Sequence, residues 1–459
     1  MGCLFLNYSV TPDKPDQNQS KMIDKQKIGL CLSGGGYRAA AYHIGTLRAL
    51  REMNILDKVD VISSNSGGSI TAAAYCLHQG DWTAFENKMF SGLKRNMIIR
   101  LVPRLLIVLL IDGLLNYLLW EYLGAYILLC TTLALLLALG FFQYQLLPFS
   151  KRNEKSYRKF FVGKSVLEDL PKSPQLVMNS TNMETGSPFT FATDQMGDTV
   201  YRYPPEGTEK ITFKHKKFPV ARAIAASTCV PFAFSPVRIK KQFFNPESGY
   251  KRVNPRLVDG GVYDNQGIHR LTHPRSRYKC NIIIVSDAGN EMPFKNSYSN
   301  VLSLLIRVSD VFMNRIRNLQ VMELLYDNVN SRQRVVAYQA LSWNPEHSID
   351  KFIDSVLDGN VLERVWKAHG ITDKHIAAAN SKDENIKDEN KKKITSTLKA
   401  SIGYEQIIKE ANSETQTKLA RSVGTNLVPI APAKQEALIN HAKVMTHLQV
   451  KLYCPGFSQ

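Results

Sequence analysis

The sequence predicts an α/β layered fold with a mostly parallel central sheet, and three observations carry this prediction. Residues 27–33 and 59–63 are short apolar runs, and each ends at a glycine-rich turn that opens onto a helix-like stretch. Strand, helix, strand and helix at this spacing favour a right-handed crossover between parallel strands. At 459 residues and 44% hydrophobic content, the chain can also bury a large core.

The elements follow one another in a simple order. The first strand, 27–33, ends at Gly34-Gly35-Gly36 and leads into a helix over 37–53, which is rich in Ala, Leu and Arg. The second strand, 59–63, precedes the turn Asn65-Ser66-Gly67-Gly68 and a helix over 68–79. Later strands are predicted at 175–180, 190–193, 256–259 and 281–286, and a closing helix at 433–451.

A helical hairpin is predicted between the second helix and the later strands. Residues 122–142 are 21 residues without a charge, enough to cross about 30 Å of hydrocarbon as a helix. The stretch 105–120 is also apolar but contains Asp112 and Asn116, and Glu121 and Gly124 mark the turn. Both outer flanks are basic, with Lys94, Arg95, Arg100 and Arg104 before the hairpin and Lys151, Arg152, Lys155, Arg158 and Lys159 after it.

By the positive-inside rule both flanks belong on the cytoplasmic face. We therefore predict a transmembrane or re-entrant hairpin over 99–148, with the rest of the chain on the cytoplasmic side of the membrane. A buried helix pair inside a large globular domain is the alternative, because an ionisable group such as Asp112 is costly in lipid.

The hairpin interrupts one domain and does not separate two. The predicted division is an N-terminal tail (1–26), the first part of the domain (27–98), the hairpin (99–148), the second part of the domain (149–375), a charged mobile insertion (376–400) and a C-terminal helical part (401–459). The insertion contains the run SKDENIKDENKKK at 381–393, which we expect to be exposed.

Charge and cysteine content narrow the class of partner. The balance of 58 Lys+Arg against 40 Asp+Glu gives a net charge of +18, which attracts an anionic partner. Beside a membrane hairpin we expect anionic headgroups in that role and no nucleic acid. Seven scattered cysteines without C-x-x-C spacing indicate reduced thiols and no zinc site. The N-terminus lacks the pattern of a secretory signal.

The two glycine-rich turns point to hydrolase chemistry. A strand, a sharp turn and a helix are the setting in which a nucleophilic serine is held out of the backbone, and Ser66 is in that position. Gly34, Gly35 and Gly36 place adjacent N–H groups at a helix N-terminus, which favours an oxyanion.

A serine hydroxyl also needs a base. None of the ten histidines lies in a recognisable catalytic turn, whereas Asp259 ends an apolar strand and is followed by two glycines. Partial burial that raised the pKa of this carboxylate would let it act as the base.

Four segments together resemble the patatin-like phospholipases, and they occur in the family's order. They are 33–39 (SGGGYRA), 65–68 (NSGG), 226–236 (ASTCVPFAFSP) and 259–265 (DGGVYDN). Plant patatins have Asp at the position of Ser33, so this glycine turn is more similar to that of the cytosolic phospholipase A branch. The resemblance covers about 27–98 and 160–290, and it departs from the usual G-x-S-x-G elbow at Ser64.

This resemblance implies a three-layer α/β/α fold and a Ser66–Asp259 dyad that cleaves acyl esters of phospholipids or lysophospholipids through an acyl-enzyme. It implies an oxyanion hole at Gly34, Gly35 and Gly36 and a phosphate-binding or electrostatic role for Arg38, for which a salt bridge on its helix face is the alternative. We expect no metal or other cofactor. The hairpin is not part of the minimal family pattern. The sequence indicates neither the headgroup and position that are cleaved nor an oligomeric state.

Two other classes of protein share some of these features. Gly34, Gly36 and Ala39 also fit a dinucleotide-binding G-x-G-x-x-A turn, with Asp57 and Asp60 about twenty residues further on. A non-catalytic membrane scaffold that kept the fold is the other alternative, although the presence of both Ser66 and Asp259 argues against it.

Overall fold

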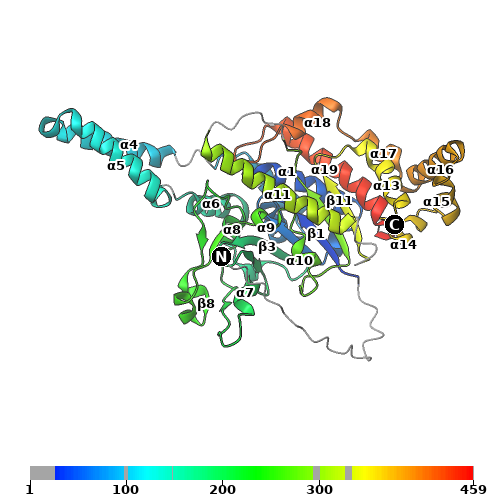
Figure 1. Ribbon diagram of the computed structural model, residues 1–459, viewed down its shortest axis with the longest axis horizontal. Coiled ribbons are helices and arrows are strands. Elements are labelled where there is room, and N and C mark those ends of the chain that lie inside the picture. Colours follow the sequence, from blue (N-terminus) through cyan, green and yellow to red (C-terminus); the bar gives the residue numbers. More distant parts are fainter. Residues whose placement is uncertain (1–25, 98–101, 147, 293–299, 326–332, 458–459) are drawn as a thin grey trace.

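A central β-sheet with helices on both faces forms the body of the protein, and a long helical hairpin projects from one end (Figure 1). The computed structural model describes residues 26–97, 102–146, 148–292, 300–325 and 333–457. The predicted N-terminal tail therefore lies outside the described residues, apart from its last position.

The strands are β1 (Ile28–Leu32), β2 (Val61–Asn65), β3 (Gln175–Asn182), β4 (Ser187–Ala192), β5 (Met196–Asp198), β6 (Thr212–Phe213), β7 (Val237–Arg238), β8 (Phe244–Asn245), β9 (Arg256–Asp259), β10 (Ile282–Asp287) and β11 (Val335–Ala340). The helices are α1 (Gly36–Glu52), α2 (Gly67–Leu77), α3 (Trp82–Leu93), α4 (Val102–Leu123), α5 (Ala125–Leu146), α6 (Phe149–Tyr157), α7 (Thr199–Arg202), α8 (Val220–Ser227), α9 (Gly261–Asp264), α10 (His269–Thr272), α11 (Val301–Leu325), α13 (Ser348–Leu357), α14 (Glu363–Lys367), α15 (Asp373–Ala379), α16 (Glu384–Ile402), α17 (Tyr404–Lys409), α18 (Glu414–Arg421) and α19 (Pro432–Tyr453). The strands and helices predicted around the two glycine turns and the closing helix are all present.

The sheet is mixed, which corrects the prediction of a mostly parallel one. Its order is β11-β10-β1-β2-β3-β4-β5, and β9 pairs with both β3 and β7. The five strands from β11 to β3 are parallel, whereas the pairings β3–β4, β4–β5, β3–β9 and β7–β9 are antiparallel. Helices lie on the connections β1–β2, β2–β3 and β10–β11, whose strands are parallel. β3 and β4 are joined by a short connection, which permits only antiparallel pairing.

Alternate residues along the strands point to opposite helical layers. On one face, Leu30 and Ile62 pack in a core with α1, α2 and α19. On the other face, Cys31 and Ile283 pack with α10 and with Leu324 near the end of α11. This alternation is the period-two pattern of a sheet buried on both sides, and it gives three layers.

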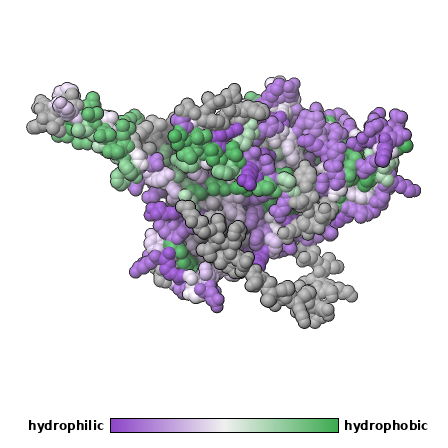
Figure 2. All heavy atoms as spheres, in the orientation of Figure 1, coloured by the Kyte–Doolittle hydropathy of each residue, from purple (hydrophilic) through white to green (hydrophobic). Residues whose placement is uncertain are grey.

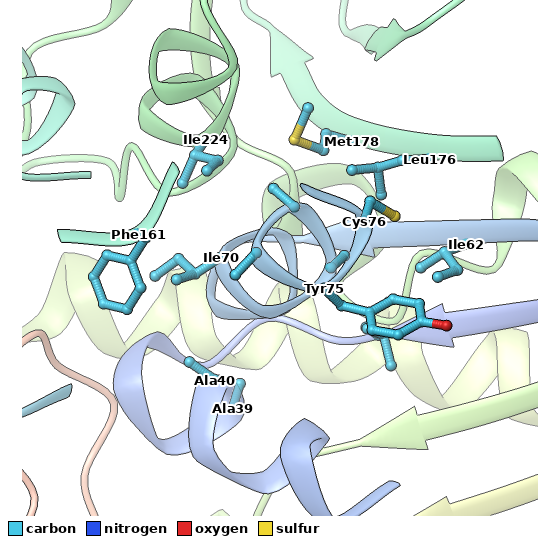
Figure 3. Packing of buried hydrophobic residues seen from close by; sticks show 14 of the residues in the cluster. Ala39, Ala40, Ile62, Ile70, Tyr75, Cys76, Phe161, Leu176, Met178 and Ile224 are labelled. Carbon is cyan, nitrogen blue, oxygen red and sulfur yellow. The ribbon is translucent and has the colours of Figure 1, made fainter. Parts of the chain in front are cut away.

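Helix α2 lies against the sheet directly behind the second glycine turn. Figure 3 shows Cys76 of this helix near Leu176 of β3, and Ile70 of the same helix near Phe161, all of them buried. Ile224 of α8 joins the same cluster. The turn that precedes α2 is therefore fixed by a continuous apolar core on one side.

The predicted hairpin is present as α4 and α5, which turn at Gly124 with a φ of 53°. The hydroxyl of Thr131 on α5 donates to Asn116 Oδ1 on α4 at 2.8 Å, and Asn116 Nδ2 donates to the Asp112 carbonyl at 2.8 Å. The polar residues noted in the sequence thus lie at the contact between the two helices.

The outer faces of α4 and α5 expose many large apolar side chains (Figure 2). In the described part of the chain no single helix has the length and apolarity of a membrane span, but the bent pair Tyr126–Ala138 and Gly140–Val162, with 56° between its halves, meets these criteria together. Membrane insertion of the hairpin stays a prediction.

Most of the charged run at 381–393, which was predicted to be an exposed and mobile insertion, belongs to helix α16. The Asp383 side chain caps this helix by accepting from the N–H groups of Asn385 and Ile386 at 2.9 and 3.4 Å. Further along, Ile394, Leu398 and Ile402 are buried in a second core with α13 and α19. The charges lie mostly on the exposed side of the helix, as predicted.

Candidate active site

Strands β2 and β9 bring the predicted nucleophile and base together, because they meet end to end beside the long strand β3. β2 runs parallel to β3 and ends with Asn65 opposite Asn179, whereas β9 runs antiparallel and ends with Asp259 opposite Ser180. Ser66 follows directly after β2. Its side chain lies near enough to the Asp259 carboxylate to stabilise the ionised form of that group.

The turn around Ser66 has the strained shape of a nucleophile elbow. Ser66 has φ 47° and ψ −121°, a conformation that non-glycine residues seldom adopt. A Cβ at Gly67 would lie 2.0 Å from the Gly36 carbonyl oxygen, and one at Gly68 would lie 2.3 Å from that of Leu32. Only glycine therefore fits at these two positions.

Ser64, which replaces the first glycine of the usual elbow, is accommodated here. Its side chain is buried, and its hydroxyl lies 3.1 Å from that of Ser69 on α2. A small polar side chain thus fills this position and has a hydrogen-bond partner.

Asp259 is buried among uncharged donors. It is 5% exposed, and its carboxylate accepts a hydrogen bond from the Gly261 N–H at 2.7 Å. Burial raises the pKa of Asp259 to about 6, and the Gly261 N–H and the Ser66 side chain oppose that rise. The carboxylate is ionised at neutral pH and still close enough to its pKa to exchange a proton.

The first glycine turn lies against Ser66, since a Cβ at Gly34 would be 3.1 Å from Ser66 Cβ. The Gly34 N–H donates to the Asn265 carbonyl at 2.8 Å, so it is not free to bind an oxyanion. This differs from the oxyanion role predicted for Gly34, which instead lets the turn lie close to Ser66. Within the described chain, the N–H groups of Gly35, Gly36 and Gly67 have no protein acceptor.

Gly67 is a further candidate oxyanion donor, which was not among the residues predicted from the sequence. The signal was available, because the residue after the nucleophile supplies one of the oxyanion N–H groups in nucleophile elbows. Gly67 also lies against Gly36, with its Cβ position 3.0 Å from Gly36 N. The two backbones thus approach each other at the start of α1 and α2.

Ser227 at the end of α8 connects the two halves of the site, and the sequence predicted no role for it beyond membership of a family motif. Its hydroxyl accepts from the Ser66 N–H at 2.9 Å and lies 2.9 Å from the Ser69 hydroxyl. Its carbonyl accepts from the Gly260 N–H at 3.2 Å. One residue therefore holds both the elbow and the Asp259 turn.

Asn65, Asp264 and Asn265 shape the site from within. Asn65 Nδ2 donates to the Asp264 carbonyl. The Asp264 carboxylate accepts from the N–H groups of Gly267 and His269 at 3.0 and 2.7 Å. These contacts hold the turn that follows Asp259 in place.

Arg38 lies beside the first glycine turn. Its Nη2 is 3.4 Å from the Cβ position of Gly35, and its Nη1 donates to the Val423 carbonyl at 3.2 Å. The Arg38 Nε is buried with no hydrogen-bond partner among the described residues. One edge of the guanidinium is thus fixed to a loop.

No histidine in the described residues is hydrogen-bonded to Ser66 or Asp259. His43 lies between Ser286 Oγ and the Ser33 carbonyl, both at 2.9 Å, and burial lowers its pKa to about 4. This supports the choice of a carboxylate as the base.

The position of Asp60 argues against a dinucleotide-binding protein. In such a protein the Asp60 side chain would have to reach a ribose near the glycine turn. Its carboxylate instead accepts from the Ile28 N–H at 2.8 Å, at the start of β1. The glycine turn is at the other end of that strand.

Helix α11 passes along the side of the site formed by α9 and α10. A Cβ at Gly261 would lie 3.0 Å from Met313 Cε, and Arg317 Nε lies 2.7 Å from Asp287 Oδ2. A cavity of about 360 Å³ lies between these elements, with Val262, Ile268 and Ile316 among its lining residues. Apolar space thus begins close to Asp259.

A family model described as patatin-like phospholipase matches residues 30–272, just over half of the chain. The chain belongs to this family. The match spans both glycine turns, Ser227 and the Asp259 turn. Membership of the patatin-like phospholipases supports a lipid hydrolase in general terms, without fixing the substrate.

One curated protein and two solved structures are among those similar to the chain. A Caenorhabditis elegans protein, patatin-like phospholipase domain-containing protein ZK370.4, is 42% identical over 67 residues, which are 14% of this chain and only 5% of that protein. Human GIVD cytosolic phospholipase A2, in complex with methyl gamma-linolenyl fluorophosphonate, is 12% identical, with a TM-score of 0.42 over 94% of this chain and 58% of that one. VipD from Legionella pneumophila is 13% identical, with a TM-score of 0.31 over 92% of this chain and 91% of that one.

Replacing Ser227 by alanine should slow this patatin-like enzyme without weakening substrate binding. The change removes the acceptor for the Ser66 N–H, and losing one buried hydrogen bond is worth about 1–2 kcal/mol, or about 5- to 30-fold in kcat. KM for a soluble short-chain ester should stay within about twofold. Thr71→Val, which removes an equally buried hydroxyl that donates to the Ala40 carbonyl at 2.8 Å, is the control and should leave kcat unchanged. Equal losses in both variants would contradict the role of Ser227.

The pH profile should report the buried carboxylate. Because protonated Asp259 cannot accept the Ser66 proton, kcat/KM for a soluble ester should fall about tenfold per pH unit below about 6 and reach a plateau above it. The exposed His273, changed to Gln, should leave this inflection in place. An inflection at the ordinary aspartate value of 3.8 would show that the titrating base is not the buried carboxylate.

Proposed function

We propose that the protein is a membrane-associated serine acyl hydrolase that cleaves the carboxylic esters of phospholipids or lysophospholipids. The observation that carries this proposal is the juxtaposition of Ser66, held in a strained elbow after β2, and the buried Asp259 carboxylate at the end of β9. Family membership adds the class of reaction. A nucleophile and a base in contact beside free backbone N–H groups form the minimal apparatus for acyl transfer.

In the proposed mechanism Ser66 Oγ attacks the ester carbonyl carbon while its proton passes to Asp259. The N–H groups of Gly35, Gly36 and Gly67 stabilise the oxyanion that develops on the carbonyl oxygen. The tetrahedral intermediate then collapses, and the leaving alcohol takes the proton from Asp259. Water next attacks the acyl-Ser66 ester with Asp259 again as base, releasing the fatty acid and restoring the serine.

Arg38 is proposed to bind the phosphate of the substrate. Its guanidinium is fixed at one edge by the Val423 carbonyl and lies next to Gly35, while its buried Nε lacks a partner in the described chain. An always-charged planar donor suits a phosphate oxygen. This position also places the phosphate at the N-terminus of α1, where the helix dipole favours an anion.

The hairpin is proposed to hold the enzyme on the cytoplasmic face of a membrane, with anionic headgroups at its base. Its exposed apolar helices are followed by α6, which carries the exposed cations Lys151 and Lys155. Helix α6 is in turn fixed to the site region, since the Tyr157 hydroxyl donates to Thr228 Oγ1 at 3.0 Å, one residue beyond Ser227. A hairpin in the bilayer would therefore keep the site next to its lipid substrate.

Labelling by a fluorophosphonate probe tests the nucleophile. The wild type should form a covalent Ser66 adduct, Ser66→Ala should form none, and Asp259→Asn should label at least about 100-fold more slowly because the serine lacks its base. Ser286→Ala, another buried serine at the end of a strand, should label like the wild type. Persistent labelling of Ser66→Ala would refute the assignment, and an unreactive wild type would favour the scaffold alternative. A lipid panel on the wild type would then identify the substrate.

Replacing residues 102–146 by a short Gly-Ser linker tests the membrane proposal. The variant should remain in the supernatant after sedimentation with vesicles of phosphatidylcholine and phosphatidylserine, whereas the full chain should pellet. Fluorophosphonate labelling of the variant serves as the control for correct folding. A labelled variant that still pellets would contradict the role of the hairpin as the anchor.

A further inference from the structure

Helix α11 presents apolar side chains outward along most of its length. Leu304, Val308, Val311, Phe312, Leu319 and Met322 are between 39 and 58% exposed. Their spacing of three and four residues places them on one side of the helix. A surface helix of a globular protein normally shows the reverse pattern, with its apolar side toward the core.

The opposite side of α11 is attached to the candidate site. Arg317 forms an ion pair with the buried Asp287, and the side chain of Gln320 hydrogen-bonds to Asp264. Met313 contacts the Asp259 turn at Gly261, and Leu324 enters the core on that face of the sheet. The helix is therefore fixed in place by its polar and inner residues, so its apolar outer side is a stable surface of the protein.

The outer side of α11 and the hairpin are exposed together. Figure 2 shows apolar residues gathered on the hairpin and over α11 on the same viewed face of the molecule. Exposed apolar patches of this kind mark interaction sites. The net charge of +18 and the exposed Arg315 within the helix favour a partner that combines an apolar interior with anionic surface groups.

From these observations we infer that the outer face of α11 is a second lipid-contacting surface, which seats the catalytic domain in the membrane interface over its substrate. The inference rests on the proposed function. It assigns different roles to the two surfaces, because the hairpin anchors the chain and α11 orients the site. An amphipathic helix lying in the interface buries its apolar side by about 5–10 Å, which would bring the Asp259 side of the site to the level of the lipid esters.

The test compares hydrolysis of a lipid in vesicles with hydrolysis of a soluble short-chain ester. Phe312→Ser combined with Leu319→Ser should reduce the rate on phosphatidylcholine–phosphatidylserine vesicles at least about tenfold, because two apolar anchors are lost. The same variant should hydrolyse the soluble ester at the wild-type rate and should still pellet with vesicles through the hairpin. Ile386→Ser on α16, which removes an isoleucine that is 45% exposed, is the matched control and should change none of the three readouts.

The possible failures can be distinguished. A wild type without activity on the soluble ester would refute the proposed dyad, and a wild type that does not pellet would refute the anchor. If both hold and the α11 variant hydrolyses vesicle lipid like the wild type, the inference about α11 is wrong. A wild type that sediments as a dimer without lipid, and becomes monomeric on Phe312→Ser, would assign this face to a second copy and would equally overturn the inference.

Discussion

The candidate site depends on one constraint, the end-to-end meeting of two strands beside a third. β3 pairs along one edge first with β2 and then with β9, which runs in the opposite direction. The side chains of β3 strengthen this register, since the hydroxyls of Ser180 and Thr181 donate to the carbonyls of Val258 and Asp259 at 2.6 and 2.9 Å. A slip of one residue would turn the Asp259 side chain to the other face of the sheet. The pairing of β9 therefore decides whether Ser66 has a base.

Hydroxyls, amides and close backbone contacts, rather than ion pairs, then fix the two turns. Ser227 binds the elbow through its hydroxyl and the Asp259 turn through its carbonyl, and Asn65 spans the same gap from the other side. No cation among the described residues forms an ion pair with Asp259. The uncharged partners affect the basicity of Asp259, because a neighbouring cation would lower the pKa of its carboxylate and weaken it as a base.

The sequence predicted local features well and long-range pairing poorly. The strands before each glycine turn and the Ser66 elbow follow from apolar runs that end at glycines, a signal contained within a few residues. The antiparallel direction of β9 and the bridging role of Ser227 depend on contacts between segments more than thirty residues apart, which no local pattern specifies. Helix α16 was not predicted, because the signals for it, the Asp383 cap and the apolar stripe of Ile394, Leu398 and Ile402, lie beside a run of charges.

Burial of Asp259 links stability to the proposed chemistry. With a folded pKa of about 6 against an ordinary 3.8, the folded protein binds a proton more tightly than the unfolded chain does. The contribution of this group to stability is therefore most favourable at low pH and falls as pH rises from about 4 to 6, by about 3 kcal/mol in all. The enzyme would work at pH values above about 6, where Asp259 contributes least to stability and its ionised carboxylate can take the proton of Ser66. A membrane that covers α11 would keep bulk water from this region. Exclusion of water would maintain the raised pKa of Asp259 and would also favour entry of an apolar substrate.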